Sequence, residues 1–300
     1  MRLFFKIVFG LFALALLVIA VFLVPPHVQT QGVEPDLPDE QTLRDLMSIE
    51  DGPVAVHYIL NASQNVRGRP LGHSSFIVEW ANGNLFMIDA GMDAEGATAF
   101  AELMKSIGGG GESAFFGTVA DQLGSHAARV KGIGFTHLHI DHTQGITSFC
   151  EARGTGADLL QTDFQRDLHN FNTTEGAELV AGSCLSRGTL EGTVLLTNEA
   201  FPGLGMVALG GHTPGSTLFV VGLKNRLWLF SGDITNTKED ILTNTGKGFV
   251  YSGLLVPENT GRTRKLRLWL RSLNVKDDID VVVSHDLGAL QATGMPKFGE

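Results

Sequence analysis

The 300-residue chain is short of basic residues and of cysteine. It has 22 lysines and arginines against 32 aspartates and glutamates, a formal net charge of −10. Because phosphate contacts need a basic surface, this balance argues against a nucleic-acid partner. The only cysteines are Cys150 and Cys184, and neither belongs to a metal-ligand pattern. In an oxidising compartment they could pair, but the sequence leaves a disulfide and two free thiols equally open.

The sequence also lacks an internal repeat, and it has one long apolar run. Arg2 and Lys6 precede Ile7–Val24, which contains no charged or strongly polar residue. Eighteen helical residues span about 27 Å, close to the ~30 Å hydrocarbon core of a bilayer. A cleaved signal peptide usually has a shorter apolar region of ~7–15 residues, followed by an Ala-x-Ala-like site. The triplet at residues 13–15 lies inside the run, so we predict an uncleaved anchor, with a removed signal peptide as the alternative.

The residues that flank this run predict its orientation and the division of the chain. The two basic residues before it should stay in the cytoplasm, and acidic residues follow on the exit side. We therefore expect residues 1–24 to be a membrane anchor or signal peptide and residues 25–50 to be a Pro- and acid-rich tether. Residues 51–300, with 43% hydrophobic content in the whole chain, can bury one substantial core. This domain should face the periplasm or cell exterior from a single-pass inner-membrane anchor, or be secreted after cleavage.

The densest group of chemically active side chains follows the predicted strand 130–136. It consists of His137, His139, Asp141 and His142. Alternation along an extended chain would send the first three to one face, and a tight turn can bring His142 beside them. Imidazole nitrogen and carboxylate oxygen together suit Zn²⁺ and related divalent ions. The alternative, a strand end with polar residues facing water, is disfavoured because later segments repeat the pattern.

Three later apolar runs each end in a possible metal ligand. Residues 205–209 precede His212, residues 227–230 precede Asp233, and residues 281–283 precede His285. Each ligand would thus lie at the end of a buried strand or on the turn after it. Ligands on the loops of a rigid scaffold can be held tightly enough for coordination.

Further elements follow from apolar patterning and turn residues. We expect strands at 54–60, 75–80, 85–89 and 217–222, with a hairpin turn at 81–84, and helices at 94–107, 146–151 and 259–273. The last helix carries five basic residues around an apolar stripe. We expect its basic face to be solvated, with contact to anionic lipid or substrate as the alternative. Its basic residues are Arg262, Arg264, Lys265, Arg267 and Arg271.

The His-x-His-x-Asp-His motif, followed in order by His, Asp and His, resembles the metallo-β-lactamase superfamily over about residues 54–290. The resemblance implies an α/β fold, an αββα four-layer sandwich of two mixed β-sheets flanked by helices, here preceded by one transmembrane helix. It also implies two Zn²⁺ per chain, with Mn or Fe as alternatives. In that family's arrangement one metal would be held by His137, His139 and His212, and the second by Asp141, His142 and His285, with Asp233 bridging both.

This ligand set implies hydrolysis. Two divalent ions ~3.5–4 Å apart lower the pKa of a shared water and polarise the substrate oxygen. A zinc-bound water can ionise near pH ~7, so the expected reaction is attack of a metal-bound hydroxide on a carbonyl or phosphoryl centre. Asp141 and Asp233 are the candidate catalytic residues, because they can orient the hydroxide and accept a proton. Of the two, Asp141 is the first candidate.

Four more residues are candidates for supporting the ligands or contacting the substrate. Asp89 ends a predicted strand where the family uses an Asp to support the ligand loop; a turn-capping carboxylate is the alternative. His73 could contact substrate or a ligand, or be a hydrogen-bonded loop histidine. Tyr251 and its neighbour Phe249 could line a pocket or pack in the core. Asn236 lies three residues past Asp233, where it could donate a hydrogen bond to substrate.

The residue types at positions 233 and 236 discriminate among substrates. β-Lactamases with three histidines on the first zinc and a cysteine at the second site place that Cys where Asp233 stands, and the branch without the Cys also lacks a bridging Asp. Lactonases share the bridging Asp but usually have Tyr at the position of Asn236. Glyoxalase II-like enzymes share the ligands, but their substrate is cytosolic. We therefore expect a hydrolase of a small ester or lactone. The alternatives are a phosphodiesterase or phosphorylcholine-type esterase using Lys247, Arg262 or Arg264, a β-lactam hydrolase, and a non-catalytic metal-stabilised envelope binding module.

Overall fold

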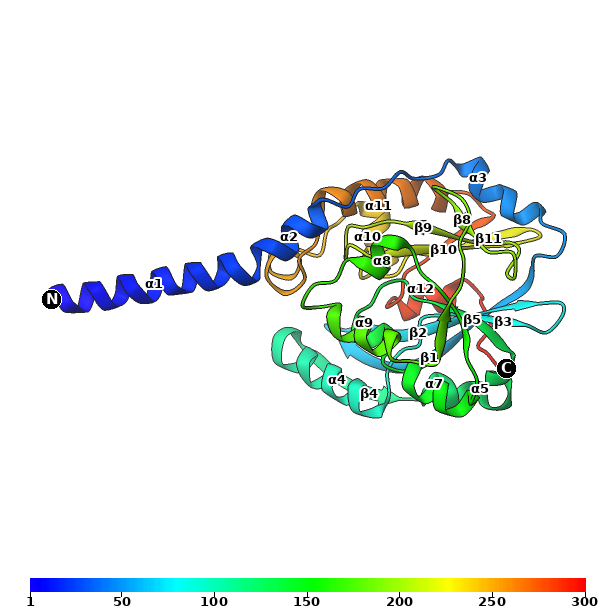
Figure 1. Cartoon of the computed structure of the whole chain (residues 1–300), viewed down its shortest axis with the longest axis horizontal. Helices are drawn as coiled ribbons and strands as arrows, with labels where there is room; N and C mark the ends of the chain where they lie inside the picture. The colour runs from blue at the N-terminus through cyan, green and yellow to red at the C-terminus, as the bar shows by residue number, and fades with distance from the viewer.

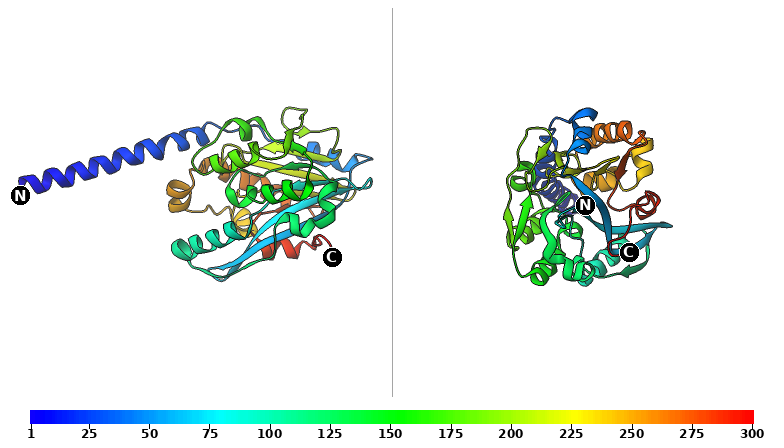
Figure 2. Two further views of the ribbon diagram at one scale, coloured as in Figure 1. Left: turned by 60° about the horizontal axis from the view of Figure 1, so that its bottom comes forward. Right: turned by 90° about the vertical axis from the view of Figure 1, so that its right-hand side faces the viewer.

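Two β-sheets stack face to face, with helices on both outer sides (Figure 1 and Figure 2). This computed structural model describes residues 1–300. The first sheet has seven strands in the order β4-β1-β2-β3-β5-β6-β7. They are β1 (Pro53–Val66), β2 (Arg69–Trp80), β3 (Leu85–Ile88), β4 (Gly110–Phe115), β5 (Val130–Gly134), β6 (Ala157–Leu160) and β7 (Leu185–Arg187).

The second sheet has five strands in the order β12-β11-β10-β9-β8. They are β8 (Leu196–Thr197), β9 (Leu204–Ala208), β10 (Thr217–Leu223), β11 (Arg226–Phe230) and β12 (Ile279–Val282). Both sheets are mixed, because β3, β5, β6 and β7 run parallel in the first, and β11 and β12 run parallel in the second. The predicted αββα sandwich of two mixed sheets is confirmed.

Aromatic side chains fill the space between the sheets. The rings of Phe76 from the first sheet and Phe230 from the second lie 4.4 Å apart, and both side chains are fully buried. Two glycines of β5 leave room for two further rings. A Cβ at Gly132 would lie 2.4 Å from the ring of Phe201, and one at Gly134 would lie 2.3 Å from the ring of Phe219. The strand that leads to the histidine motif is therefore fixed by packing from the opposite sheet.

Helices cover the outer faces of both sheets through two further apolar clusters. The first sheet is covered by α5 (Val119–Leu123), α7 (Ile146–Arg153) and α9 (Thr174–Ala181), and the second by α3 (Glu40–Arg44), α10 (Lys238–Thr243) and α11 (Thr260–Asn274). The remaining helices are α4 (Ala94–Gly108), α6 (Ile140–Thr143), α8 (Asp163–Asp167), α12 (Leu287–Ala292), the 3-10 turns η1 (Asp45–Ser48) and η2 (Gly124–Arg129), and the π-helical turn η3 (Tyr251–Leu255).

The predicted strands and helices are present, and the main difference is length. β1 and β2 extend well past the predicted 54–60 and 75–80 because they continue as a paired arm up to Val66 and Arg69. β4, which was not predicted, pairs with the outer side of this arm. Apolar alternation fades in the arm, which explains why the sequence pattern stopped short.

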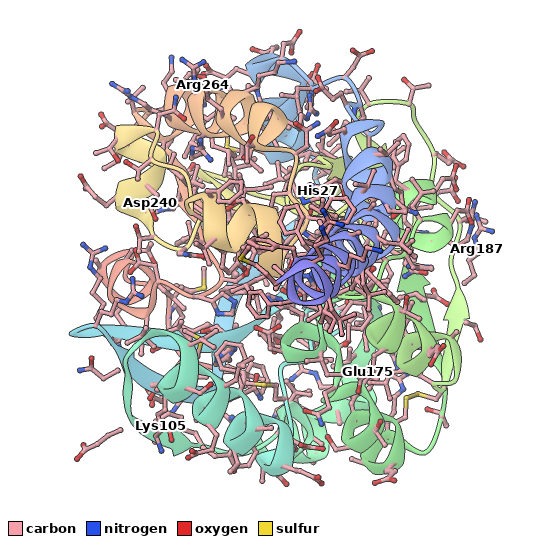
Figure 3. All side chains as sticks on the ribbon, turned by 90° about the vertical axis from the view of Figure 1, so that its left-hand side faces the viewer. His27, Lys105, Glu175, Arg187, Asp240 and Arg264 are labelled. Atoms are coloured by element: carbon pink, nitrogen blue, oxygen red, sulfur yellow. A yellow bond between two sulfur atoms is a disulfide. The ribbon has the colours of Figure 1, made fainter.

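The N-terminus forms a helix that leaves the domain at one end. α1 (Arg2–Phe22) has no buried residue, and α2 (Val24–Gln31) follows after Leu23. Figure 1 shows α1 projecting away from the sandwich, and Figure 3 looks along it onto the face from which it leaves. Together, Arg2–Gln31 form one 30-residue helical span. This span is long and apolar enough to cross a membrane.

Residues 33–48 are not part of a free tether. Leu43 is fully buried and Leu46 nearly so, and both join the apolar cluster between the second sheet and α11. Arg44 forms an ion pair with Asp278 just before β12. The prediction of a tether over 25–50 is therefore wrong for this part. The leucines between the prolines and acidic residues form a strap that packs onto the domain.

The basic face of α11 also differs from expectation. The guanidinium of Arg262 is buried and donates to the backbone carbonyls of Leu209 and Pro35. Arg267 is buried and donates to the side chain of Asn244. Only part of the predicted solvated face is exposed, because two of its arginines bind carbonyl groups that no other donor reaches.

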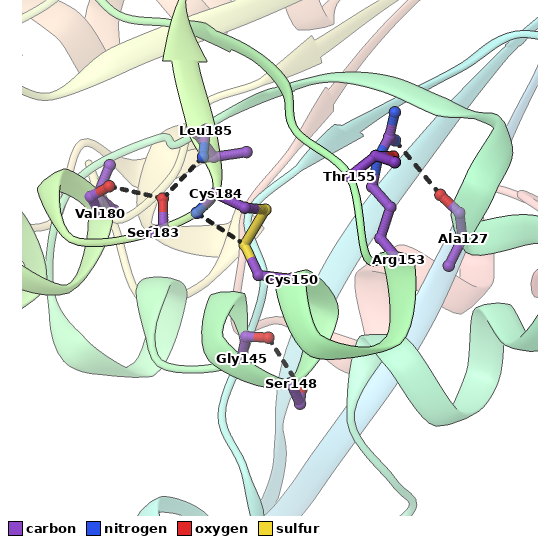
Figure 4. Close-up of a disulfide and its surroundings, with 10 residues drawn as sticks. All are labelled: Ala127, Gly145, Ser148, Cys150, Arg153, Thr155, Val180, Ser183, Cys184 and Leu185. Atoms are coloured by element: carbon purple, nitrogen blue, oxygen red, sulfur yellow. Dashed lines mark hydrogen bonds between the residues drawn. A yellow bond between two sulfur atoms is a disulfide. The ribbon is translucent and has the colours of Figure 1, made fainter.

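Cys150 and Cys184 form a disulfide (Figure 4), which settles the question that the sequence left open. Their Cα atoms are 5.6 Å apart. Cys150 lies on α7 and Cys184 directly precedes β7, so the bond joins the helix behind the histidine motif to the edge of the first sheet. Since both cysteines are paired, the protein has no free thiol.

Candidate metal centre

The histidine motif folds as a short loop and one helical turn. β5 ends at Gly134, and His137 and His139 occupy the extended residues that follow. α6 then begins at Ile140, so Asp141 and His142 lie on a helical turn. Strand alternation was expected to align Asp141 with His137 and His139, and a tight turn to add His142; in the structure Asp141 already lies on the helical turn together with His142. The backbone N–H of His142 donates to the carbonyl of His139 at 3.0 Å, which closes this turn.

The three later candidates meet the motif from the second sheet. His212, Asp233 and His285 follow β9, β11 and β12, and all three side chains are buried. Asp233 Oδ1 lies 3.2 Å from His285 Nε2 and 3.7 Å from His142 Nε2. Its Oδ2 lies 3.9 Å from His212 Nε2. The seven predicted ligands are therefore brought together, with Asp233 between the two groups.

The possible ligand atoms form three groups, two of which share His137, and within each group these atoms lie within 4.8 Å of one another. One is the predicted first-metal set, and a second combines Asp233 with two histidines of the motif. A third contains Asp141, His285 and, in addition, His73. These groups are His137, His139 and His212; His137, His142 and Asp233; and His73, Asp141 and His285.

The hydrogen bonds of the histidines fit metal ligation. The Nδ1 atom of His142 bonds Asp89 at 3.0 Å, that of His212 bonds Glu258 at 2.6 Å, and that of His285 bonds the carbonyl of Gly72 at 2.8 Å. An acceptor at Nδ1 fixes the proton there and leaves the Nε2 lone pair facing inward. The Nε2 atoms of His137, His139, His142 and His212, and Oδ1 of Asp233, are buried without a hydrogen-bond partner. Two bound cations would give these unpaired nitrogen and oxygen atoms a partner.

Asp89 supports the motif from the end of β3, as the resemblance implied. Its Oδ1 accepts from the backbone N–H of Thr136 at 2.7 Å, and its Oδ2 accepts from Thr136 Oγ1 at 2.8 Å. The same Oδ2 bonds His142. The backbone of Asp89 has φ +61°, a left-handed conformation that Asp tolerates better than most residues. One carboxylate thus holds both ends of the ligand loop.

Glu258 is a supporting residue that the sequence did not reveal. Besides His212, its carboxylate accepts from Ser252 Oγ at 2.5 Å and lies 3.4 Å from Lys247 Nζ. The side chains of Lys247 and Glu258 are each only 2% exposed. Lys247 Nζ also lies over the ring of Tyr251, 4.8 Å from its centroid. A single glutamate before a helix carries no motif, and no signal in the sequence linked it to His212, 46 residues away.

Of the three other predicted contact residues, two lie at the centre and one does not. His73 is buried against the centre, with its ring 4.8 Å from that of His285 and its Nδ1 3.4 Å from Asp141 Oδ2. Tyr251 stacks parallel to His212 with ring centroids 6.5 Å apart. Asn236 is exposed. The structure therefore brings His73 and Tyr251 to the centre and leaves Asn236 on the surface.

Burial and charge set the protonation of the ligands in the metal-free protein. Burial lowers the pKa of His139 to about 3, so this imidazole is neutral and able to ligate. Burial would lower the pKa of His142 as well, but the carboxylates of Asp89 and Asp141 outweigh it and raise this pKa to about 10. Although burial favours their neutral form, nearby histidines hold the pKa values of Asp141 and Asp233 below the usual range. Both carboxylates are therefore charged and suited to cations.

A buried, dinuclear arrangement of histidines and aspartates at the strand ends of an αββα sandwich defines a metal-dependent hydrolase. A model of the metallo-β-lactamase superfamily matches residues 68–285, a range that includes all seven predicted ligands. The chain belongs to the metallo-β-lactamase superfamily. A comparison with curated proteins gave no match.

Solved structures share the fold at low sequence identity. A probable metal-dependent hydrolase from Staphylococcus aureus has a TM-score of 0.54 and 15% identity, covering 79% of this chain and 91% of that one. A hydrolase named AbOPH, of the β-lactamase superfamily, has a TM-score of 0.50 and 15% identity, covering 78% and 90%. AidC, a dizinc quorum-quenching lactonase in complex with a product, has a TM-score of 0.50 and 15% identity, covering 72% and 73%. At this identity the similarity concerns the fold alone.

Proposed function

We propose that the protein is a dinuclear zinc hydrolase that cleaves the ester or lactone bond of a small molecule. The observation that carries this proposal is the position of Asp233. One of its carboxylate oxygens faces His142 and His285, and the other faces His212. A carboxylate whose two oxygens face different groups of histidines suits a ligand that bridges two metals. The dizinc lactonase AidC has a similar fold. The Cys that one branch of the β-lactamases has at this position is absent, and the branch without this Cys lacks a bridging Asp.

The ligands are assigned to two metals by their grouping. His137, His139 and His212 would hold the first ion. Asp141, His142 and His285 would hold the second, and Asp233 both. Two bound divalent ions would supply a Lewis acid for the carbonyl oxygen and lower the pKa of a water. Zinc suits this nitrogen-rich set, and Mn or Fe are the alternatives.

Asp141 and Asp233 are proposed to hold and move the proton during hydrolysis. Asp141 Oδ2 lies 3.4 Å from both His285 Nε2 and His73 Nδ1. His73 can therefore orient this carboxylate, and we propose it as a positioning residue. Tyr251 is proposed to contact the substrate, because its ring stacks on His212 at the metal centre. Burial raises the pKa of its phenol, which therefore stays protonated. A protonated phenol beside His212 can donate a hydrogen bond to the substrate oxygen, the role expected of Asn236, which is exposed.

Two of the three basic residues that could hold a phosphate in the phosphoester alternative are engaged by other groups of the protein. Lys247 is engaged by Glu258, and Arg262 is engaged by two backbone carbonyls. Of the three basic residues considered for a phosphate, only Arg264 is exposed. An uncharged carbonyl substrate therefore fits the donors at the centre better than a phosphate does.

The proposed location is the inner membrane, with α1 as an uncleaved anchor and the catalytic domain on the periplasmic or exterior side. The disulfide supports an oxidising compartment. Intact mass of the purified protein distinguishes this from secretion after cleavage, because removal of the 21-residue α1 would be visible directly.

Metal content and turnover of the full-length protein test the function. We expect about two zinc ions per chain, and turnover of esters or lactones that a chelator abolishes and zinc restores. p-Nitrophenyl phosphodiesters should be turned over far more slowly than carboxylic esters. Fewer than one metal per chain with no metal-restored turnover would contradict the proposal, and so would a preference for phosphodiesters. Zinc binding without turnover of any ester would favour the binding-module alternative.

A further inference from the structure

The anchor is joined to the domain without a flexible linker. Only Leu23 separates α1 from α2, and α2 is fixed to the domain. His27 Nε2 bonds the carbonyl of Gly253 at 3.0 Å, and Thr30 is fully buried. The strap that follows is held by Arg262 through the carbonyl of Pro35. The face from which α1 leaves therefore has a fixed distance from the membrane.

Helix geometry gives this distance. The 18 residues of the apolar run Ile7–Val24 span about 27 Å at ~1.5 Å per residue, close to the thickness of the hydrocarbon core. His27 lies three residues past Val24, or about 4.5 Å along the axis. The interfacial layer on one side of a bilayer is about 5–7 Å thick, half the difference between the full bilayer and its core. Gly253, which His27 contacts, is thereby placed at headgroup level.

Exposed apolar side chains gather at this level. Phe249 is 78% exposed, and its neighbours Val250, Leu254 and Leu255 are also exposed. Asn172 Nδ2 donates to the carbonyl of Leu255 at 2.9 Å, which places the adjacent, exposed Phe171 beside them. Residues 248–257 contain no charged side chain. We name this surface the apolar rim, and it consists of Val28, Phe171, Phe249, Val250, Leu254 and Leu255.

The apolar rim is continuous with the metal centre. Tyr251, between its exposed members, stacks on His212, and Ser252 donates to Glu258. Charged residues such as Lys105, Arg187 and Arg264 lie toward the outline of the face in Figure 3, whereas His27 lies near its middle. One short segment thus has exposed apolar side chains on the side of the anchor and ligand-supporting side chains on the other.

We infer that the apolar rim docks on the bilayer that holds α1, and that the metal centre takes an ester or lactone with a long acyl chain from this bilayer. The inference rests on the proposed function, since it concerns the same site. The physical basis of the inference is the hydrophobic effect. An exposed apolar patch of this kind marks an interaction surface, and the fixed anchor places this patch next to the bilayer. Each CH₂ group of an acyl chain that is buried in a membrane strengthens membrane binding, so long acyl chains are concentrated next to the rim.

Depth measurement tests the docking independently of catalysis. Because the protein has no free thiol, Phe249→Cys introduces one labelling site for an environment-sensitive fluorophore. Asn225→Cys, on the exposed turn between β10 and β11, is the matched control. In nanodiscs that hold the full-length protein and nitroxide-labelled phospholipids, we expect strong quenching at 249 and none at 225. Equal quenching at both sites, or an intact mass without α1, would overturn the inference.

Chain-length dependence tests the substrate class. We compare p-nitrophenyl butyrate, which is water-soluble, with p-nitrophenyl laurate in nanodiscs. Phe249→Ser combined with Leu254→Ser should lower kcat/KM for laurate at least tenfold and leave butyrate unchanged. The control is Val275→Ser, an exposed residue just after α11, next to the start of β12 and away from the strand ends that carry the ligands. An equal change for both esters, or none for laurate, would contradict the inference. Absence of turnover with both esters in the unaltered protein would instead refute the proposed function, while the quenching result would still decide the docking.

Discussion

Replacing Glu258 with glutamine should destabilise the metal-free protein by about 3–5 kcal/mol and weaken zinc binding by about 10–100-fold. The carboxylate is nearly fully buried and accepts from His212 and Ser252, and it is the counter-charge of the equally buried Lys247. Although burial favours its neutral form, Lys247 and His212 lower the pKa of Glu258 to about 2. A neutral amide would leave the ammonium buried without a partner and His212 without a fixed tautomer.

Thermal unfolding in EDTA measures the first effect, and competition with a zinc chelator measures the second. For a domain of this size, 1 kcal/mol corresponds to a shift of about 2–4 °C in Tm, so a loss of roughly 10 °C is expected. Glu239→Gln, an exposed residue on α10, is the matched control and should change Tm by less than about 2 °C. The variant that combines Lys247→Met with Glu258→Gln should recover part of the lost stability, because no unpaired charge remains.

The pH dependence gives a second readout for the same pair. Because the folded-state pKa of Glu258 is depressed from 4.5 to about 2, its contribution is fully present above pH ~4.5 and is lost as the pH falls toward 2. The difference in stability between the unaltered protein and the glutamine variant should therefore shrink below pH ~4.5. A Tm difference of less than 2 °C at pH 7, or a double variant whose loss equals the sum of the two single losses, would refute the buried-pair argument.

Three further outcomes are expected. His139→Ala should abolish turnover and reduce the bound metal while circular dichroism shows the fold unchanged; retained turnover would contradict its role as a ligand. Reducing the Cys150–Cys184 bond, which closes a loop with a sequence separation of 34, should cost about 3–4 kcal/mol in urea unfolding, and an unchanged midpoint would argue against it. Because His142 has its pKa raised to about 10 without metal, zinc binding at pH 7 should release a proton and strengthen as the pH rises. Calorimetry in buffers of different ionisation enthalpy measures this proton, and identical enthalpies would exclude its release.

The metal ligands could be predicted from the sequence because each follows a recognisable apolar strand. His137, His139 and His142 are close along the chain, and His212, Asp233 and His285 each end a run of buried residues. The contact between Glu258 and His212 had no such signal, since it forms only through the fold. The family and the αββα class followed from the ordered motif, which a model over residues 68–285 confirms.

Predictions failed where they rested on the composition of a segment, because composition does not reveal which other segments it contacts in the fold. Prolines and acidic residues in 25–50 indicated a tether, but the spacing of Leu43 and Leu46 matches a groove on the second sheet that only the folded domain presents. Five basic residues on one helix indicated a solvated face, but Arg262 lies next to carbonyl groups from distant parts of the chain. The disulfide likewise depended on a distance that no sequence pattern encodes.

Asp89 has a consequence for how this site can vary. Its left-handed backbone allows few side chains, and its two oxygens serve Thr136 and His142 at once. A glycine would relax the backbone but release the loop, and a larger residue would keep neither the conformation nor the contacts. Replacements that change the metal preference are thus better sought among the side chains around His212. The ligand there is supported by a separate charge pair, which can be altered while Asp89 still holds the histidine motif.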